Sequence, residues 1–266
     1  MIITFLSDYG RDDDFVGVCH GVIAGIAPEV QVVDISHGVP RHDVRQGALT
    51  LRNALPYMPI GVHIAVVDPQ VGTERRGVAL RTGDGHMLVG PDNGVLSLAW
   101  DEAGGVAEAF DVSRSPYRIE PVSATFHGRD VFAPVAAYLA IGSELRESGE
   151  ELDPAELERI ELPQPRVEDG VLHAHVLTVD KFGNVALNVG HEQLAGTDIK
   201  LGQRVEIEAR GERYLATYAH TFADVRPGEI LVYEDSYRAL SIAINRGDAA
   251  ATLHVRPDAE LRLAPR

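Results

Sequence analysis

Two loops of the chain carry side chains that together could activate water. Asp68 and Arg75 lie seven residues apart in one loop, and His127 stands beside Gly128 at the expected entrance of a later helix. A carboxylate, a guanidinium and an imidazole that meet can hold a water molecule, orient it and stabilise hydroxide character on its oxygen. An Asp–Arg pair that only fixes the loop, with a capping His, is the plainer alternative, and the residue types alone leave both open.

Polar side chains also follow the strands expected in the first part of the chain. Asp8 follows the first apolar run, Asp34 and His37 close the second, and Asp68 follows the third. Because ligands of open α/β sheets bind outside the carboxyl ends of the strands, we expect these groups to line one edge of a sheet. Asp92, in a Gly-Pro-Asp-Asn-Gly run, is more simply a turn former.

A metal centre is one alternative for this edge. Its residues of zinc-binding type are Asp8, His37, Asp68 and His127. Against this, the chain has no His-x-x-x-His or paired Cys, and Arg75 would repel a divalent cation. The other histidines, His20 among them, share no spacing and are interpreted as structural or surface residues. We therefore expect no metal and no cofactor.

The spacing of apolar residues predicts an α/β N-terminal domain. The expected strands are 2–6, 30–35, 62–67, 78–81 and 86–89, and the expected helices are 13–26, 43–55 and 129–141. Strands that alternate with helices favour a largely parallel sheet with helices on both faces. Residues 143–165 are charged, contain three prolines and show no strand pattern. We place the N-terminal domain at 1–160 and a second domain at 166–266.

The second domain shows the pattern of an all-β, barrel-like fold. Short apolar runs separated by turn residues predict strands at 171–179, 185–189, 204–209, 214–218, 229–233, 240–245 and 250–255.

Composition narrows the class of protein. The formal net charge of −16 opposes nucleic-acid binding, which needs a basic surface. No apolar run approaches the roughly 18 residues that span a bilayer. The first apolar run is not preceded by the basic segment that is typical of a signal peptide. Cys19 is the single cysteine, so an intramolecular disulfide is excluded. These features predict a cytoplasmic protein without a membrane partner.

Six motifs occur in an order that resembles one known family. They are Ser7-Asp8-Tyr9-Gly10, Val33-Asp34-Ile35-Ser36-His37, Val67-Asp68-Pro69-Gln70-Val71-Gly72-Thr73, Gly90-Pro91-Asp92-Asn93-Gly94, Thr125-Phe126-His127-Gly128-Arg129-Asp130 and Asp180-Lys181-Phe182-Gly183-Asn184. Each motif is weak alone, but the ordered set resembles the S-adenosylmethionine hydroxide adenosyltransferases, relatives of fluorinase and chlorinase. The match runs from about residue 2 to about residue 253.

The resemblance implies hydrolysis of S-adenosylmethionine to adenosine and methionine, by attack of water on the ribose C5′ carbon. It implies a homotrimer with active sites between the N-terminal domain of one subunit and the C-terminal domain of its neighbour. Asp68, Arg75 and His127 would act on the water. The implied substrate-binding residues are Asp8 for the ribose hydroxyls, Asp13 near the methionine moiety, Phe126 by the sugar, Asp180 for the amino group, Asn184 for adenine and Ser236 for the methionine carboxylate.

The same resemblance favours water over halide as the nucleophile. The halogenating relatives bind a bare anion with a small hydroxyl side chain, and Gly128 lacks that hydroxyl. Asp68 stands where fluorinase has a Tyr, and a carboxylate repels halide. The alternatives are a halogenase-type adenosyltransferase, a non-catalytic protein that binds S-adenosylmethionine or adenosine, and a metal-dependent hydrolase. A methyltransferase is disfavoured because no Gly-rich loop follows the first strand.

Overall fold

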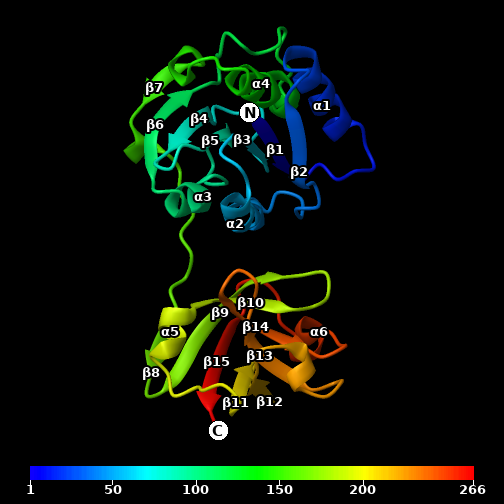
Figure 1. Ribbon diagram of the computed structural model, residues 1–266, viewed down its shortest axis with the longest axis vertical. Helices are drawn as coiled ribbons and strands as arrows, with labels where there is room; N and C mark the ends of the chain where they lie inside the picture. Colours follow the sequence, from blue (N-terminus) through cyan, green and yellow to red (C-terminus); the bar gives the residue numbers. More distant parts are fainter. The chain divides into compact units, whose positions relative to one another are not determined.

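A computed structural model describes residues 1–266 of the chain as two compact units, Met1–Ile160 and Glu161–Arg266 (Figure 1). Each unit buries its own apolar side chains, so each has a hydrophobic core of its own. None of the helices combines the length and the apolar character that crossing a bilayer requires.

A seven-stranded sheet forms the centre of the first unit, in the order β2-β1-β3-β5-β4-β6-β7. Its strands are β1 (Ile2–Ser7), β2 (Gln31–Ser36), β3 (Val62–Val66), β4 (Gly77–Thr82), β5 (Met87–Pro91), β6 (Val106–Asp111) and β7 (Glu150–Leu152). The strands β2, β1, β3 and β5 are parallel, and β4, β6 and β7 continue the sheet antiparallel. The four parallel strands therefore end at one edge, where the polar residues follow them.

Helices cover both faces of this sheet, as the sequence predicts. They are α1 (Phe15–Ile26), α2 (Val44–Ala54), α3 (Ser97–Glu102) and α4 (Ala133–Ala140), with single 3-10 turns at Leu55–Tyr57, Leu145–Glu147 and Pro154–Glu156. Because side chains alternate along a strand, Phe5 packs in the core that includes α1 and α4, and the next residue, Leu6, packs in the core that includes α2 and α3 (Figure 1). Both faces of the sheet are buried, which confirms the α/β class.

The second unit is a closed barrel of seven strands. In barrel order they are β10 (Val185–Gly190), β14 (Ala239–Ile244), β13 (Ile230–Glu234), β12 (Glu212–Tyr218), β11 (Arg204–Ala209), β15 (Glu260–Pro265) and β9 (Val171–Val179). Pairing of β10 with the last residues of β9 closes the ring, and β8 (Arg166–Glu168) pairs antiparallel with the first residues of β9. The short helices are α5 (His191–Ala195), α6 (Ala249–Leu253) and a 3-10 turn at Phe222–Asp224.

One predicted strand of this barrel is wrong. Residues 250–255 lie mostly in helix α6, because the Asp248 side chain accepts a hydrogen bond from the backbone N–H of Ala251 at 2.8 Å and caps a run of alanines. The seventh strand is β15, in which Leu261 and Leu263 point into the core.

Two further predictions in the first unit are wrong in detail. The segment 143–165 contains the short edge strand β7, which backbone pairing with β6 holds in place although its side chains are polar. The helix expected at 129–141 is two pieces, a π-helical turn at Gly128–Phe132 followed by α4. Pro134 lies in the first turn of α4, where its missing N–H is tolerated.

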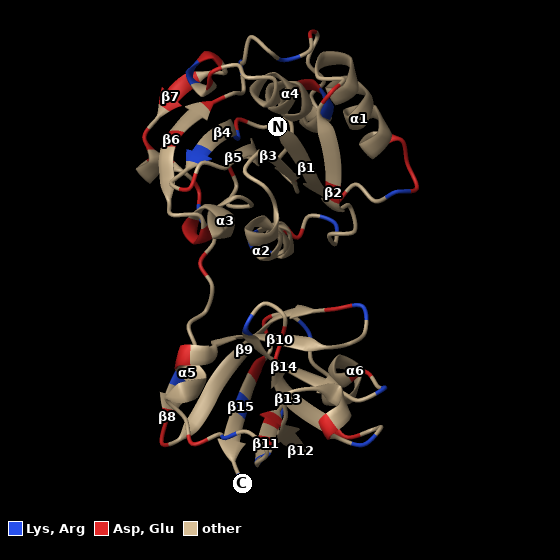
Figure 2. Ribbon diagram, viewed as in Figure 1, with Lys and Arg blue, Asp and Glu red and all other residues tan.

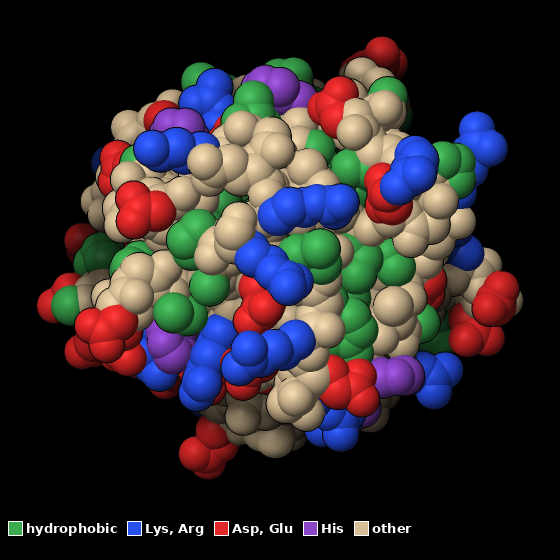
Figure 3. Space-filling model, turned by 90° about the horizontal axis from the view of Figure 1, so that it is seen from below, with side chains coloured by type: hydrophobic (Ala, Val, Ile, Leu, Met, Phe, Trp, Pro, Cys, Tyr) green, Lys and Arg blue, Asp and Glu red, His purple; other side chains and the backbone are tan.

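Charged residues are spread over both units (Figure 2), whereas α1 carries none. On the face drawn in Figure 3, basic side chains gather toward the middle and acidic side chains surround them. On the barrel, cross-strand ion pairs such as Arg213–Glu206 and Arg262–Glu208 join the two signs. These pairs neutralise individual charges locally on the barrel wall.

Candidate active site

A close backbone contact brings the two candidate loops together. Gly72, in the loop after β3, has a φ of +81°, and a Cβ added there would lie 2.4 Å from the carbonyl oxygen of Ala124. Only glycine fits this approach without displacing backbone. The loop that bears Asp68 and Arg75 therefore packs directly on the segment that leads into His127.

Asp68, Arg75 and His127 form one hydrogen-bonded group. Arg75 donates from Nε to Oδ1 of Asp68 at 3.2 Å and from Nη2 to Oδ2 of the same carboxylate. Its Nη2 also lies 3.1 Å from Nδ1 of His127. The Asp68 and Arg75 side chains are only 6% and 4% exposed. A bidentate pair at this depth holds its geometry before any ligand arrives.

The protonation states of this group follow from its contacts. A guanidinium has donors only, so Nδ1 of His127 accepts from Arg75, and a neutral ring then carries its hydrogen on Nε2. Burial and the nearby Arg75 lower the pKa of His127, which keeps the imidazole neutral. Burial raises the pKa of Asp68, against the opposing effect of Arg75. Asp68 is therefore a better proton acceptor than an exposed aspartate.

The neighbouring Arg76 has a different task. It donates from Nε to Oδ2 of Asp92 at 2.9 Å and from Nη2 to the carbonyl oxygen of Glu156 at 2.7 Å. Asn93 donates to the carbonyl oxygen of Val67 at 2.8 Å. Arg76, Asp92 and Asn93 thus fix the turn after β5, in line with the turn-forming interpretation of that motif.

Asp8 and Tyr9 lie on the same sheet edge. Oδ2 of Asp8 accepts from the backbone N–H of His42 at 2.9 Å. Burial raises the pKa of Tyr9 well above its usual value, and the carboxylates of Asp68 and Asp8 raise it further. The Tyr9 hydroxyl is therefore held in its neutral form. No local sequence pattern marks Tyr9 as a functional residue, although it directly follows Asp8.

Tyr9 also fills the space beside Gly128. A Cβ added at Gly128 would lie 2.1 Å from the Tyr9 hydroxyl oxygen and 3.1 Å from its ring. Phe126 packs edge-on against Tyr9 and Phe15, with ring centroids 5.8 and 5.2 Å apart. Gly128 is required here because the tyrosine occupies the volume that a side chain would need.

The remaining polar residues of this edge form a second, separate group. Asp34 pairs with His20 and His37, and it lies with Asp13 in the lining of a pocket of about 480 Å³. Another pocket, of about 800 Å³, is lined by Arg75 and Arg76 among others. The structure thus brings the three predicted catalytic residues together and places Asp13 in the lining of a different pocket.

In the barrel, Asp180 organises the turn between β9 and β10. Its Oδ1 accepts from the backbone N–H groups of Phe182 and Asn184 at 2.8 and 2.9 Å, and its Oδ2 accepts from the Asn184 amide at 2.8 Å. Phe182 is 66% exposed. Of the two predicted ligand-binding residues of this turn, Asp180 is exposed and Asn184 is half-buried, and they are hydrogen-bonded to each other.

Asp235 organises the turn that carries Ser236 in the same way. Its Oδ1 accepts from the backbone N–H groups of Tyr237 and Ala239 at 2.8 and 3.0 Å, and Ser236 is exposed at the tip. Burial raises the pKa of Tyr233 to about 12, with further contributions from Asp235 and Asp180. The negative charges of both turns therefore favour the neutral form of Tyr233, a residue that no local sequence pattern marks as functional.

An α/β unit that carries an Asp–Arg–His group is followed by a β-barrel, which is the two-domain architecture that the motif resemblance implies. Residues 3–149 match the SAM hydroxide adenosyltransferase N-terminal domain, and residues 174–262 match the SAM hydroxide adenosyltransferase C-terminal domain. The chain belongs to this family.

Three relatives show the range of the similarity. An (R)-S-adenosyl-L-methionine hydrolase of Salinispora tropica is 48% identical over 98% of this chain and 97% of its own. A fluorinase of Actinopolyspora mzabensis is 30% identical over 98% of this chain and 96% of its own. The crystal structure of an uncharacterized conserved protein from Thermotoga maritima aligns with a TM-score of 0.93 and 36% identity, over 98% of this chain and 99% of that one.

Proposed function

We propose that this protein hydrolyses S-adenosylmethionine to adenosine and methionine, with Asp68, Arg75 and His127 acting on the attacking water. The family membership and the 48% identity to a named hydrolase support the reaction. The observation that carries the catalytic assignment is the buried Arg75 guanidinium, which bonds Asp68 and His127 at once. These groups are held rigidly enough to position one solvent molecule.

The chemistry follows from the charges. The water oxygen forms a bond to C5′ as the C5′–S bond breaks, and the sulfur leaves with the bonding pair as the neutral thioether of methionine. Asp68 accepts the hydrogen bond and then the proton of the water, because each carboxylate oxygen keeps a second lone pair beside Arg75. The Nε2–H of His127 donates to the nucleophile, and Arg75 stabilises its developing negative charge. His127 orients the water and does not take its proton.

The contact between Tyr9 and Gly128 supports water as the nucleophile. A hydroxyl side chain at position 128, which the halogenating relatives use to hold an anion, would collide with the Tyr9 hydroxyl. The nearby carboxylates of Asp8 and Asp68 add negative charge where a halide would have to enter. Anion binding at this point is opposed by both shape and charge.

The substrate contacts and the assembly are part of the same proposal. Asp8 accepts from the ribose hydroxyls, Phe126 packs by the sugar, Asp13 lies near the methionine moiety, Asp180 binds the amino group, Asn184 reads adenine and Ser236 binds the carboxylate. The protein acts as a homotrimer, in which the N-terminal unit of one subunit and the C-terminal unit of its neighbour share each substrate. No cofactor takes part in the reaction. Sedimentation equilibrium should give three times the chain mass of 28.8 kDa.

The reaction is tested by incubation with S-adenosylmethionine in oxygen-18 water, followed by mass analysis of the products. We expect adenosine that carries one heavy oxygen at its 5′ position, at the same rate with and without added chloride or fluoride. Halide-dependent loss of substrate would instead assign the protein to halogenation. Binding of S-adenosylmethionine without formation of any product would show that the protein binds the nucleoside but does not catalyse the reaction.

A further inference from the structure

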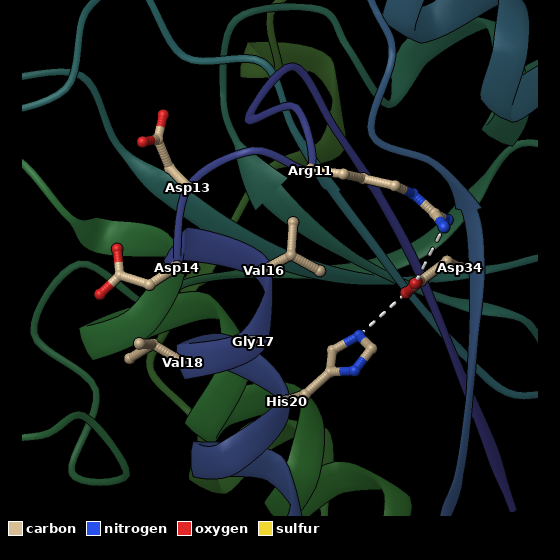
Figure 4. A pocket seen from close by; sticks show the side chains of 8 residues that line it. All are labelled: Arg11, Asp13, Asp14, Val16, Gly17, Val18, His20 and Asp34. Atoms are coloured by element: carbon tan, nitrogen blue, oxygen red, sulfur yellow. Dashed lines mark hydrogen bonds and ion pairs between the residues drawn. The ribbon is translucent and has the colours of Figure 1, made fainter.

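A second polar group on the sheet edge brings two imidazoles to one carboxylate oxygen. Oδ1 of Asp34, in β2, lies 2.9 Å from Nε2 of His20 in α1 and 3.1 Å from Nε2 of His37, which follows β2. One ligand atom from each of these residues lies within 4.8 Å of the other two. Figure 4 shows Asp34 between His20 and Arg11, with Asp13 and Asp14 turned away.

His37 has the features of a prepared ligand. Its side chain is fully buried, and Nδ1 lies 2.7 Å from Oγ of Ser7. Its Nε2 is buried and has no partner in hydrogen-bond geometry, although Asp34 is close. The ring therefore does not aim Nε2 along a hydrogen bond to Asp34. When Nδ1–H donates to Ser7, the ring keeps a lone pair on Nε2, 3.1 Å from Oδ1 of Asp34, that can bind a metal ion.

We propose that His20, Asp34 and His37 bind a divalent transition-metal ion such as Zn²⁺. Two imidazole nitrogens and one carboxylate oxygen form a donor set that this class of ion prefers, and a fourth position would open to the pocket that Asp34 and His20 line. Ligand atoms of a tetrahedral zinc lie about 3.4 Å apart. The two carboxylate–imidazole distances here are 2.9 and 3.1 Å, and all three ligand atoms lie within 4.8 Å of one another, so binding needs small side-chain rotations. This departs from the sequence-based expectation of no metal.

Arg11 does not block the ion. Its guanidinium lies 3.6 Å from Oδ2 of Asp34, on the other carboxylate oxygen, and its side chain is 71% exposed. It can therefore turn into solvent when a cation binds to Oδ1.

A bound ion would tie α1 to the end of β2, next to the substrate-binding loop. Gly10 donates its backbone N–H to the carbonyl oxygen of His37 at 2.8 Å, and Ser7 directly precedes Asp8. The ion would thus stiffen the loop that holds Asp8 and Tyr9. It takes no part in the proposed hydrolysis, and the two proposals stand or fall separately.

The test is calorimetric titration of the chelator-treated, dialysed protein with ZnCl₂, compared with three variants. We expect one Zn²⁺ per chain with micromolar affinity. His20→Ala removes a half-exposed ligand and should weaken binding by at least about 100-fold. Ser7→Ala removes the contact to Nδ1 and the hydrogen bond from the backbone N–H of Tyr9, and should weaken binding by about 10- to 100-fold. The control is His191→Ala, because His191 also contacts a carboxylate, Glu234 at 3.2 Å, but has no second imidazole beside it.

His191→Ala should bind Zn²⁺ as the unmodified protein does. The proposal is overturned if the unmodified protein takes up no Zn²⁺ in this range, or if His20→Ala binds it as tightly as the control. A raised melting temperature with Zn²⁺ in the control, absent in His20→Ala, would confirm that the ion acts through this group in the folded protein.

Discussion

The loops of the first unit that hold the proposed catalytic residues differ from the turns of the barrel that hold proposed substrate-binding residues. In the first unit, Asp68 and Arg75 are buried and hydrogen-bonded across a loop, and His127 joins them from 52 residues further along the chain. In the barrel, Asp180 and Asn184 satisfy each other within one turn and lie at the surface.

The difference indicates that the buried group of the first unit positions the nucleophile and that the exposed turns of the barrel recognise the substrate. A group that is held by long-range contacts keeps its geometry without a ligand, which suits a residue that must act on a water molecule. A turn that is folded by its own hydrogen bonds and open to solvent can exchange those contacts for a ligand. Substitutions in the first group should therefore lower kcat, and substitutions in the second should raise KM.

The largest effect is expected for Arg75→Ala. The nucleophile loses its cation, and Asp68 and His127 lose the group that joins them, so kcat should fall by about 1000-fold while substrate binding remains measurable. Adenosine release measured by chromatography, with calorimetry for binding, checks this.

The matched control is Arg76→Ala, which removes an adjacent guanidinium that bonds Asp92 and Glu156 instead. It should leave kcat within a few-fold of the value for the unmodified protein. It should lower the melting temperature, because the Asp92 side chain, which is 2% exposed, loses its ion-pair partner. Equal losses of turnover in the two variants would remove the distinction between these arginines.

Gly128→Ser should act through Tyr9. The new side chain meets the Tyr9 hydroxyl, so the free energy of unfolding should fall by about 1–3 kcal/mol, and turnover should fall with it. Tyr9→Phe/Gly128→Ser should recover most of the lost stability, because the removed oxygen is the closest atom. Denaturant unfolding of the four proteins in this cycle gives the coupling between the two positions. Independent, additive effects would show that the contact does not constrain position 128.

Asp180→Asn tests the barrel side of the comparison. Loss of a charge-assisted hydrogen bond to the substrate amino group, worth about 1.5–3 kcal/mol, should raise KM by about 10- to 100-fold with kcat nearly unchanged. Asp198→Asn, at another exposed acidic position of the barrel, should leave both parameters as they are. A fall in kcat alone for Asp180→Asn would place this residue with the catalytic group.

The smallest effect is expected in the pH dependence of kcat/KM, as a shift of the acid limb of the profile to higher pH. Burial raises the pKa of Asp68 above its ordinary value of 3.8, so its carboxylate becomes protonated at a higher pH than an exposed aspartate does. The ratio kcat/KM should fall as the pH drops through this raised pKa, in a range where circular dichroism still shows folded protein. An acid limb at or below pH 3.8 would show that Asp68 does not control the rate.

The sequence predicts the elements and residue types better than it predicts contacts. Apolar spacing identifies the parallel strands, and the residue types of two loops predict Asp68, Arg75 and His127 as catalytic candidates, because these signals are local. The π-helical turn at Gly128 and the edge strand β7 depend on tertiary contacts that apolar spacing does not report. The contact of Tyr9 with Gly128 and the contact of His20 with Asp34 likewise depend on how separate elements pack. No local sequence pattern predicts either contact.

The central claim is that Asp68, Arg75 and His127 hold the water that attacks C5′. The most direct test is a crystal structure with the unreactive thioether analogue S-adenosylhomocysteine. The account predicts one ordered water within hydrogen-bond distance of these side chains and about 3 Å from C5′, on the side opposite the sulfur. An analogue whose C5′ carbon lies away from the three residues, or a C5′ face closed to solvent, would contradict it.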